Sequence, residues 1–213
     1  MSLSHLARYA FSLSPQAAAG KAVEYAARVI RFRLQGLLWR NRETYAPTVD
    51  QPLPPASLLG PIDGDMLSIN AEALKELGDS VLAHRFDLLG SGPVTVVAKS
   101  RLETLSPGNR RRGAAIGKLI DPAYRPIDWQ LDFKSGYRWR ADRLSGSLAY
   151  GHEPGVDVKV PWELARCQHL SWLACRNLVE PSDRWVGEFR NQVLDFAAAN
   201  PPGYGVNWMC TMD

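Results

Sequence analysis

The chain has 213 residues, 46% of them hydrophobic, and a formal net charge of +3. It therefore has ample apolar material for one large domain or two small ones, and too little charge to imply a polyanionic partner by itself. Its three cysteines are too irregularly spaced for a disulfide framework or a zinc site, so we expect no metal or other cofactor. No signal peptide is evident, and no segment is apolar for long enough to span a membrane. We therefore expect a cytoplasmic protein.

Residues 15–40 predict a basic amphipathic helix in an N-terminal region of residues 1–45. Ser14 suits the N-cap and Pro15 the first helical position. Such a helix either packs on its own domain, which is the commoner arrangement, or lies on an anionic membrane surface.

A second region, residues 46–150, is expected to be irregular, with short extended stretches. Residues 46–64 are rich in proline and turn residues and predict a linker or long surface loop. A short helix is expected around residues 70–77, with a glycine at its end. Residues 81–98 contain two apolar runs around GSGP, which predicts two extended segments joined by a turn.

The sequence SPGNRRRGA, residues 106–114, predicts a polar, basic loop. Its three arginines, Arg110, Arg111 and Arg112, either hold an anion or are solvated, and solvation is the commoner state of such a loop.

Residues 126–140 interleave aromatic and charged side chains. An aromatic ring stacks on the apolar face of a sugar while neighbouring charges bind hydroxyls and carboxylates, so this stretch is typical of a glycan-binding surface. The same composition also builds packed, salt-bridged regions between domains. The candidates for glycan contact are Lys134, Tyr137, Arg138 and Trp139.

Two helices are predicted in a third region, residues 151–213. The first spans residues 157–178 with Pro161 at its first position, and its two cysteines, Cys167 and Cys175, are expected to be buried. The second spans residues 182–199 with Ser182 as its N-cap. Its expected apolar stripe is Trp185, Phe189, Val193 and Phe196. The short VEPS turn between the helices predicts an antiparallel helical hairpin.

Four strings in this order and spacing carry a resemblance to a known family: HRFDLLGSGP (84–93), IDWQLDFKSGYRW (127–139), GVDVKVPWELARCQHL (155–170) and NPPGYGVNWMCTMD (200–213). Together they closely resemble the N-terminal region of the heparinase II/III-like polysaccharide lyases. The most specific motif is D-x-K-x-x-W-E-x-x-R, formed by Asp157, Lys159, Trp162, Glu163 and Arg166. The resemblance covers roughly residues 80–213.

This resemblance implies a mainly α fold in which residues 151–213 are the first helical hairpin of an incomplete α/α toroid. In the family, further toroid helices and a β-sandwich follow, and lyase members cleave uronic-acid-containing glycans by β-elimination. The family's catalytic Asn, His and Tyr lie beyond the motif that ends here at Asp213, and no Asn-His pair occurs in the chain. We therefore assign no catalytic residue and expect the chain to be inactive alone, with the remaining toroid and sandwich as its partners.

The motif residues remain candidates for binding an acidic polysaccharide. Helical spacing places four of them on one face of the predicted helix. These four are Trp162, Glu163, Arg166 and His169. They bind sugar there, or Glu163 and Arg166 form a buried structural polar pair. Two more candidates, Asn207 and Trp208, follow a glycine-rich turn and either line a cleft or serve the scaffold, which is the commoner role.

Two other functions are compatible with the sequence. The chain is alternatively a non-catalytic glycan-binding or scaffold module of bacterial surface-polysaccharide metabolism. An unrelated basic protein would bind nucleic acid or membrane through residues 21–42 and 110–112, but no nucleic-acid motif occurs, so no nucleic-acid partner is expected. Because half a toroid leaves apolar helix faces uncovered, we also expect the isolated chain to associate.

Overall fold

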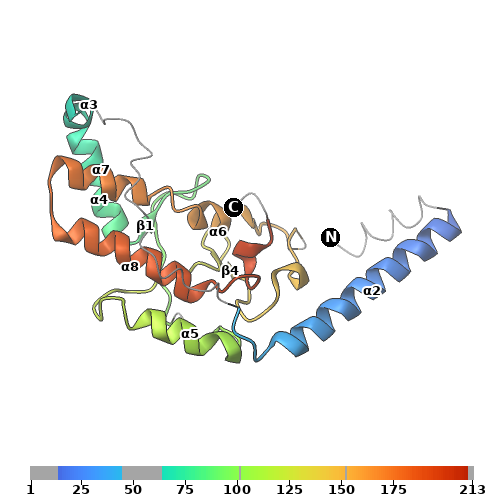
Figure 1. Cartoon of the computed structure of the whole chain (residues 1–213). Helices are drawn as coiled ribbons and strands as arrows, with labels where there is room; N and C mark the ends of the chain where they lie inside the picture. The colour runs from blue at the N-terminus through green and yellow to red at the C-terminus, as the bar shows by residue number, and fades with distance from the viewer. Residues whose placement is uncertain (1–13, 45–63, 101, 152, 211–213) are drawn as a thin grey trace.

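The computed structural model describes residues 14–44, 64–100, 102–151 and 153–210, and these fold mainly as helices (Figure 1). The mainly α prediction is therefore confirmed. Apart from Gly64, the expected linker at residues 46–64 lies outside the described residues. The helices and 3-10 turns are α2 (Pro15–Trp39), α3 (Gly64–Ile69), α4 (Ala71–Leu82), α5 (Pro107–Gly117), η1 (Ser145–Ser147), α6 (Lys159–Ala165), α7 (Leu170–Val179), α8 (Asp183–Ala199) and η2 (Val206–Trp208). The strands are β1 (Arg85–Phe86), β2 (Val94–Thr95), β3 (Leu131–Asp132) and β4 (Tyr137–Arg138).

Helix α2 begins where the sequence predicts it, since the Ser14 hydroxyl accepts a hydrogen bond from the backbone N–H of Ala17 at 3.3 Å. None of its described residues is buried, and the helix projects away from the others (Figure 1). Its C-terminal end is held by the Tyr204 hydroxyl, which donates to the carbonyl oxygen of Trp39 at 3.0 Å. The ring of Phe32 also lies against Gly146 of η1, so α2 packs on the rest of the chain through its C-terminal part, while none of its described residues is buried.

Helices α7 and α8 form the predicted antiparallel hairpin (Figure 1). Ser182 caps α8 as expected, because its hydroxyl accepts a hydrogen bond from the backbone N–H of Arg184 at 3.4 Å. Helix α4 packs against α7. The hairpin and α4 enclose a buried apolar cluster of Val81, Leu170, Leu173 and Trp185.

Helix α4 is longer than the helix predicted at residues 70–77, and Gly78 lies in its interior rather than at its end. A Cβ atom at Gly78 would stand 3.3 Å from the side chains of both Arg176 and Trp185. The glycine therefore permits the close approach of α4 to the α7–α8 hairpin.

The helix predicted at residues 157–178 is interrupted, and this corrects the expected arrangement of the motif residues. Cys167 adopts a left-handed backbone with φ of 55°, which separates α6 from α7. At its other end α6 begins at Lys159, so Pro161 lies in its third position rather than the first. The Cys167 side chain packs against both buried apolar clusters, so a tertiary contact accounts for a break that no proline or glycine signals. Trp162, Glu163 and Arg166 therefore remain together on α6 and its C-cap, whereas His169 lies beyond the break, at the start of α7.

The apolar stripe predicted for α8 is only partly buried, and its last member, Phe196, packs against Trp129 with the ring centroids 5.1 Å apart. Trp185 is buried, but Phe189 and Val193 are 41% and 43% exposed, as is their neighbour Val186 at 55%. The buried face of α8 carries as many polar as apolar residues. Its buried members are Trp185, Asn191, Gln192, Asp195, Ala198 and Ala199.

The loop predicted at residues 106–114 is wrong, because this segment begins α5, which packs against α8. Arg110 donates to the carbonyl oxygens of Leu105 and Glu103, each at 3.1 Å, and Arg111 pairs with Glu43 at 3.1 Å. Two of the three arginines are thus engaged separately, which does not favour a common anion site there.

The two predicted extended segments at residues 81–98 form the β1–β2 hairpin, with Phe86 opposite Val94. Strands β3 and β4 form a second antiparallel pair, in which Leu131 faces Arg138. One apolar cluster joins these hairpins to the helices, and its members come from both the second and the third region of the chain. They are Phe86, Val96, Ile127, Trp129, Leu164 and Ala199.

The contact of α5 with α8 depends on Gly113. A Cβ atom there would lie 2.9 Å from the carbonyl oxygen of Ala198 and 3.0 Å from Leu102 and Leu105. We expect Gly113→Ala to lower the free energy of unfolding by about 1–3 kcal/mol, the usual cost of overpacking. The matched control is Gly187→Ala in α8, where nothing lies within 4 Å and alanine should add about 0.5–1 kcal/mol. Urea unfolding of both variants measures this, and equal effects would contradict the packing role of Gly113.

Candidate functional site

Three of the predicted binding residues serve as internal hydrogen-bond donors. The indole N–H of Trp162 donates to the carbonyl oxygen of Val206 at 2.8 Å, and that of Trp139 to Ala149 at 2.9 Å. The Asn207 amide donates to the carbonyl oxygen of Trp129 at 2.9 Å. Asn207 and Trp139 are also buried, so these two side chains stabilise the fold rather than face a ligand.

The other candidates of the aromatic stretch lie around the β3–β4 hairpin. Lys134 Nζ donates to the carbonyl oxygen of Leu89 at 2.7 Å, which ties this hairpin to the β1–β2 turn. Arg138 pairs with Asp128 at 2.7 Å, and the ring of Tyr137 meets that of Trp139 edge-on at 4.8 Å. This stretch therefore contains contacts typical of packing, one of the two alternatives for its composition.

Aromatic side chains also gather around η2, where they retain access to solvent. Trp208 is 43% exposed, and Tyr150, 55% exposed, lies 6.3 Å from the ring of the half-buried Trp162. Glu163 and Arg166 form an ion pair at 2.8 Å on the adjoining helix α6. We call Tyr150, Trp162 and Trp208 the aromatic surface.

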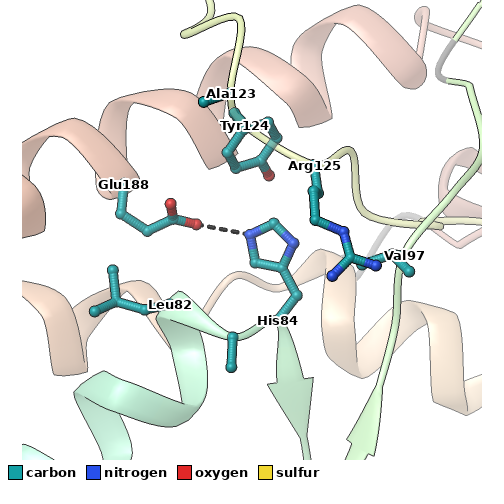
Figure 2. A pocket seen from close by; sticks show the side chains of 8 residues that line it. Leu82, His84, Val97, Ala123, Tyr124, Arg125 and Glu188 are labelled. Atoms are coloured by element: carbon teal, nitrogen blue, oxygen red, sulfur yellow. Dashed lines mark hydrogen bonds and ion pairs between the residues drawn. The ribbon is translucent and has the colours of Figure 1, made fainter.

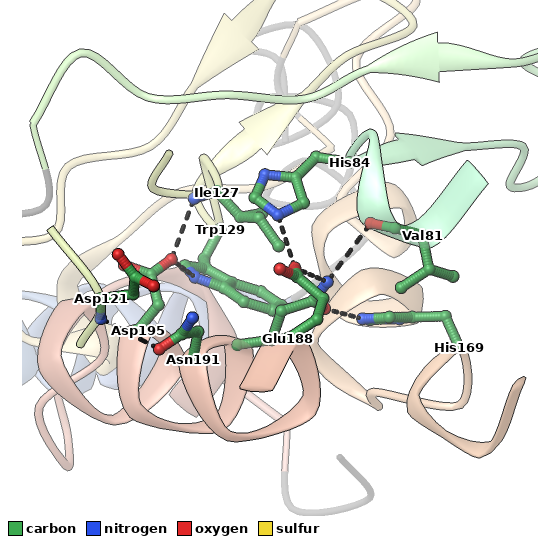
Figure 3. Close-up of polar contacts among 10 residues, drawn as sticks. Val81, His84, Asp121, Ile127, Trp129, His169, Glu188, Asn191 and Asp195 are labelled. Atoms are coloured by element: carbon green, nitrogen blue, oxygen red, sulfur yellow. Dashed lines mark hydrogen bonds and ion pairs between the residues drawn. The ribbon is translucent and has the colours of Figure 1, made fainter. Parts of the chain in front are cut away.

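A second group of polar residues lies on and against the buried face of α8, and His169 is the one member that the sequence predicted as a binding candidate (Figure 3). Glu188 Oε1 accepts hydrogen bonds from His84 Nε2 at 2.8 Å and from the Gln192 amide at 2.7 Å. Gln192 Oε1 in turn lies 2.8 Å from His169 Nε2. An ionised carboxylate only accepts, so the proton of the first bond belongs to His84.

The next turn of α8 continues this polar face. Asp195 Oδ2 accepts hydrogen bonds from the backbone N–H of Ile127 and the indole N–H of Trp129, both at 2.9 Å. Asn191 Oδ1 accepts from the backbone N–H of Asp121 at 3.1 Å (Figure 3). These bonds hold the segment of residues 121–129 against α8, and with it the wall of a cavity.

The cavity lies between the end of α4, helix α8 and residues 123–125, and has a volume of about 160 Å³. His84 stands at its centre, between Glu188 on one side and Arg125 on the other, with Tyr124 above the ring (Figure 2). The rings of His84 and Tyr124 are 5.0 Å apart. The backbone of His84 is left-handed, with φ of 50°, because this residue ends α4 where glycine is the commoner choice. This conformation costs free energy in a non-glycine residue and positions the ring in the cavity.

Burial changes the protonation of two groups near this network. It lowers the pKa of His169 to about 4, against a smaller opposing effect of the hydrogen bond to Gln192. His169 is therefore neutral at pH 7 and donates its Nε2 proton to Gln192. Burial also raises the pKa of the Cys167 thiol to about 11, so this thiol stays protonated and unreactive. Cys167 and Cys175 are half-buried, not fully buried as expected.

Within the described ranges, no three His, Cys, Asp or Glu side chains gather in a way that would hold a metal ion. Each helix in the same part of the chain is too short or too polar to cross a bilayer. Comparisons with protein-family models, curated proteins and solved structures found no match to this chain.

The polar face of α8 has a sequence signal that a search for apolar periodicity overlooks. Glu188, Asn191, Gln192 and Asp195 recur at spacings of three and four, so they share one helical face. Trp185 lies on that face too, and a buried tryptophan beside a polar stripe indicates a hydrogen-bonded interior. His84 carries no comparable local signal, because its partner Glu188 is 104 residues away.

Proposed function

We propose that this chain is the N-terminal part of a heparinase II/III-like polysaccharide lyase, acting on uronic-acid-containing glycans by β-elimination in the complete enzyme. In this proposal α7 and α8 begin an incomplete α/α toroid, and the chain alone binds glycan without cleaving it. The observation that carries the proposal is that the four strings of the resemblance, far apart in the sequence, contact one another in one folded unit.

These contacts join each string to another. Lys134 of the second string bonds to Leu89 of the first, and the carboxylate of Asp132 accepts the backbone N–H of Asp157, in the third, at 2.9 Å. The third string meets the fourth through the indole of Trp162, which donates to Val206. The proposal requires such contacts, because it assigns the four strings to one structural unit.

The aromatic surface supplies the chemistry for glycan binding. Trp208 and Tyr150 offer exposed rings for stacking on sugar, and the Glu163–Arg166 pair next to them offers groups that bond hydroxyls and carboxylates. The exposed apolar face of α8 fits the same proposal, because the next toroid helices of the family would cover it. Its residues are Val186, Phe189 and Val193.

Binding of polysaccharides by the chain and two variants tests this function. We expect alginate or heparan sulfate to bind, and Trp208→Ala to weaken binding roughly 2- to 10-fold, the magnitude of one aromatic contact. Trp172→Ala removes a tryptophan of similar exposure, 39%, from α7 and should leave binding unchanged.

The same incubations, followed by the ultraviolet absorbance of unsaturated uronate ends, should yield no product from the chain alone. Absence of binding to every acidic glycan would contradict the binding proposal and favour a scaffold. The scaffold alternative has support of its own, because several candidate side chains are occupied internally. Rapid product formation would show that the chain is an active lyase and contradict its expected inactivity.

A further inference from the structure

The cavity around His84 contains a histidine whose two ring nitrogens have different surroundings. Nε2 faces Glu188 at 2.8 Å, while Nδ1 lies on the side of the ring that faces Arg125 (Figure 2). Among the described residues, no hydrogen bond engages Nδ1. Because the carboxylate accepts the proton of Nε2, the neutral form of the ring presents the unshared electron pair of Nδ1 to the cavity.

The charge of Glu188 does not repel an anion as strongly as an unpaired carboxylate would. Its Oε1 accepts two hydrogen bonds, from His84 and Gln192, and these donors offset part of its charge. The exposed guanidinium of Arg125 is the cation of the cavity lining, and it lies on the other side of the His84 ring (Figure 2). The cavity therefore offers an acceptor at Nδ1 and a cationic donor at Arg125.

We propose that this cavity binds a hydroxycarboxylate, with the carboxylate on Arg125 and the neighbouring hydroxyl donating to Nδ1 of His84. Arginine binds carboxylates through parallel N–H bonds, and a hydroxyl is the donor that a neutral imidazole nitrogen requires. A volume of about 160 Å³ is below the roughly 300 Å³ at which pockets for drug-sized ligands begin. The ligand is therefore a small acid, or the acidic edge of one sugar residue such as a uronate.

Glu188 is a positioning residue in this proposal, because it acts through His84. It holds the Nε2–H tautomer and thereby keeps Nδ1 free to accept. In Glu188→Gln the new amide is able to donate to Nε2, which would move the proton to Nδ1. We expect this variant to raise the population of the Nδ1–H tautomer and to weaken the binding of hydroxycarboxylates, which a purely structural role of Glu188 would not do.

The test is nuclear magnetic resonance of the full chain labelled with ¹⁵N at histidine, with His84 assigned through His84→Gln. We expect the neutral form of His84 to carry its proton on Nε2 and none on Nδ1, and we expect a saturable shift of the Nδ1 resonance on addition of lactate or glucuronate. Lactate represents a free acid and glucuronate a sugar. A saturable shift of the Nδ1 resonance with either ligand supports the site. The ligand that causes it shows whether the site takes a free acid or a sugar.

Calorimetry of the same ligands completes the test. Arg125→Ala should weaken binding roughly 10- to 100-fold, the value of a charge-assisted hydrogen bond, whereas Arg111→Ala, with a side chain 87% exposed, should not. Acetate, which lacks the hydroxyl, should bind more weakly than lactate. Absence of saturable shifts with both acids, equal affinities of the two arginine variants, or equal affinities of acetate and lactate would overturn the proposal. Lactate binding is independent of polysaccharide binding, so this site and the proposed function fail or succeed separately.

Discussion

Replacement of Asp195 by alanine is expected to lower the free energy of unfolding by about 4 kcal/mol. The carboxylate is 0% exposed and accepts hydrogen bonds from the backbone N–H of Ile127 and the indole N–H of Trp129. A hydrogen bond to a charged group contributes about 1.5–3 kcal/mol, and its loss leaves a buried donor unsatisfied. Both donors lie in the buried cluster that joins the β hairpins to the helices.

Urea unfolding of Asp195→Ala and Asp195→Asn measures this effect. Asparagine keeps the volume and one acceptor oxygen, so its cost should be clearly smaller than that of alanine. Arg190→Ala, at an exposed position of the same helix, controls for changes in α8 itself and should cost less than about 0.5 kcal/mol. A cost of Asp195→Ala close to that of Arg190→Ala would contradict the anchoring role of Asp195.

Elements with local signals were predicted correctly from the sequence. Helices α2 and α8 begin at Ser14 and Ser182, whose hydroxyls cap the first turn in both sequence and structure. The α7–α8 hairpin follows from a short turn between two periodic segments. These features depend on residues within a few positions of each other, so they can be predicted from the sequence.

The errors occur where tertiary contacts decide the structure. The break at Cys167 results from packing against two clusters, and no proline or glycine marks it. Helix α8 has both an apolar and a polar stripe with helical spacing. The side that is buried depends on partners such as His84 and Trp129, which are distant in the chain. Burial of the polar stripe is possible because these partners satisfy its hydrogen bonds.

The candidate binding residues fall into two groups, those that are buried by tertiary contacts and those that stay exposed. Trp139 and Asn207 were predicted to bind glycan because their side chains donate hydrogen bonds, but in the structure both donate to backbone carbonyl oxygens inside the fold. Trp208 keeps an exposed ring on the aromatic surface. A motif thus contains residues that hold the fold together beside residues that remain available for binding, and burial distinguishes them.

The stability of the chain is expected to fall by up to about 3 kcal/mol between pH 7 and pH 4 because of His169 alone. Burial lowers the pKa of this histidine from 6.5 to about 4 in the folded chain. The unfolded chain therefore takes up the proton first as the pH falls. The contribution is fully present above pH 6.5 and is lost between pH 6.5 and 4, at about 1.4 kcal/mol for each pH unit. Because the ring is only half-buried, the loss is at most this large.

The variant His169→Gln separates this effect from the other groups that titrate in the same range. Glutamine does not titrate, and its amide is able to donate to Gln192 Oε1 as the imidazole does. Urea unfolding from pH 4 to pH 7.5 should therefore give a flatter profile for the variant, with the difference from the unmodified chain confined to the interval between pH 4 and 6.5. The carboxylates titrate in both proteins and cancel in this difference. Parallel profiles would mean that protonation of His169 is not coupled to folding, and that its ring reaches solvent in the folded chain.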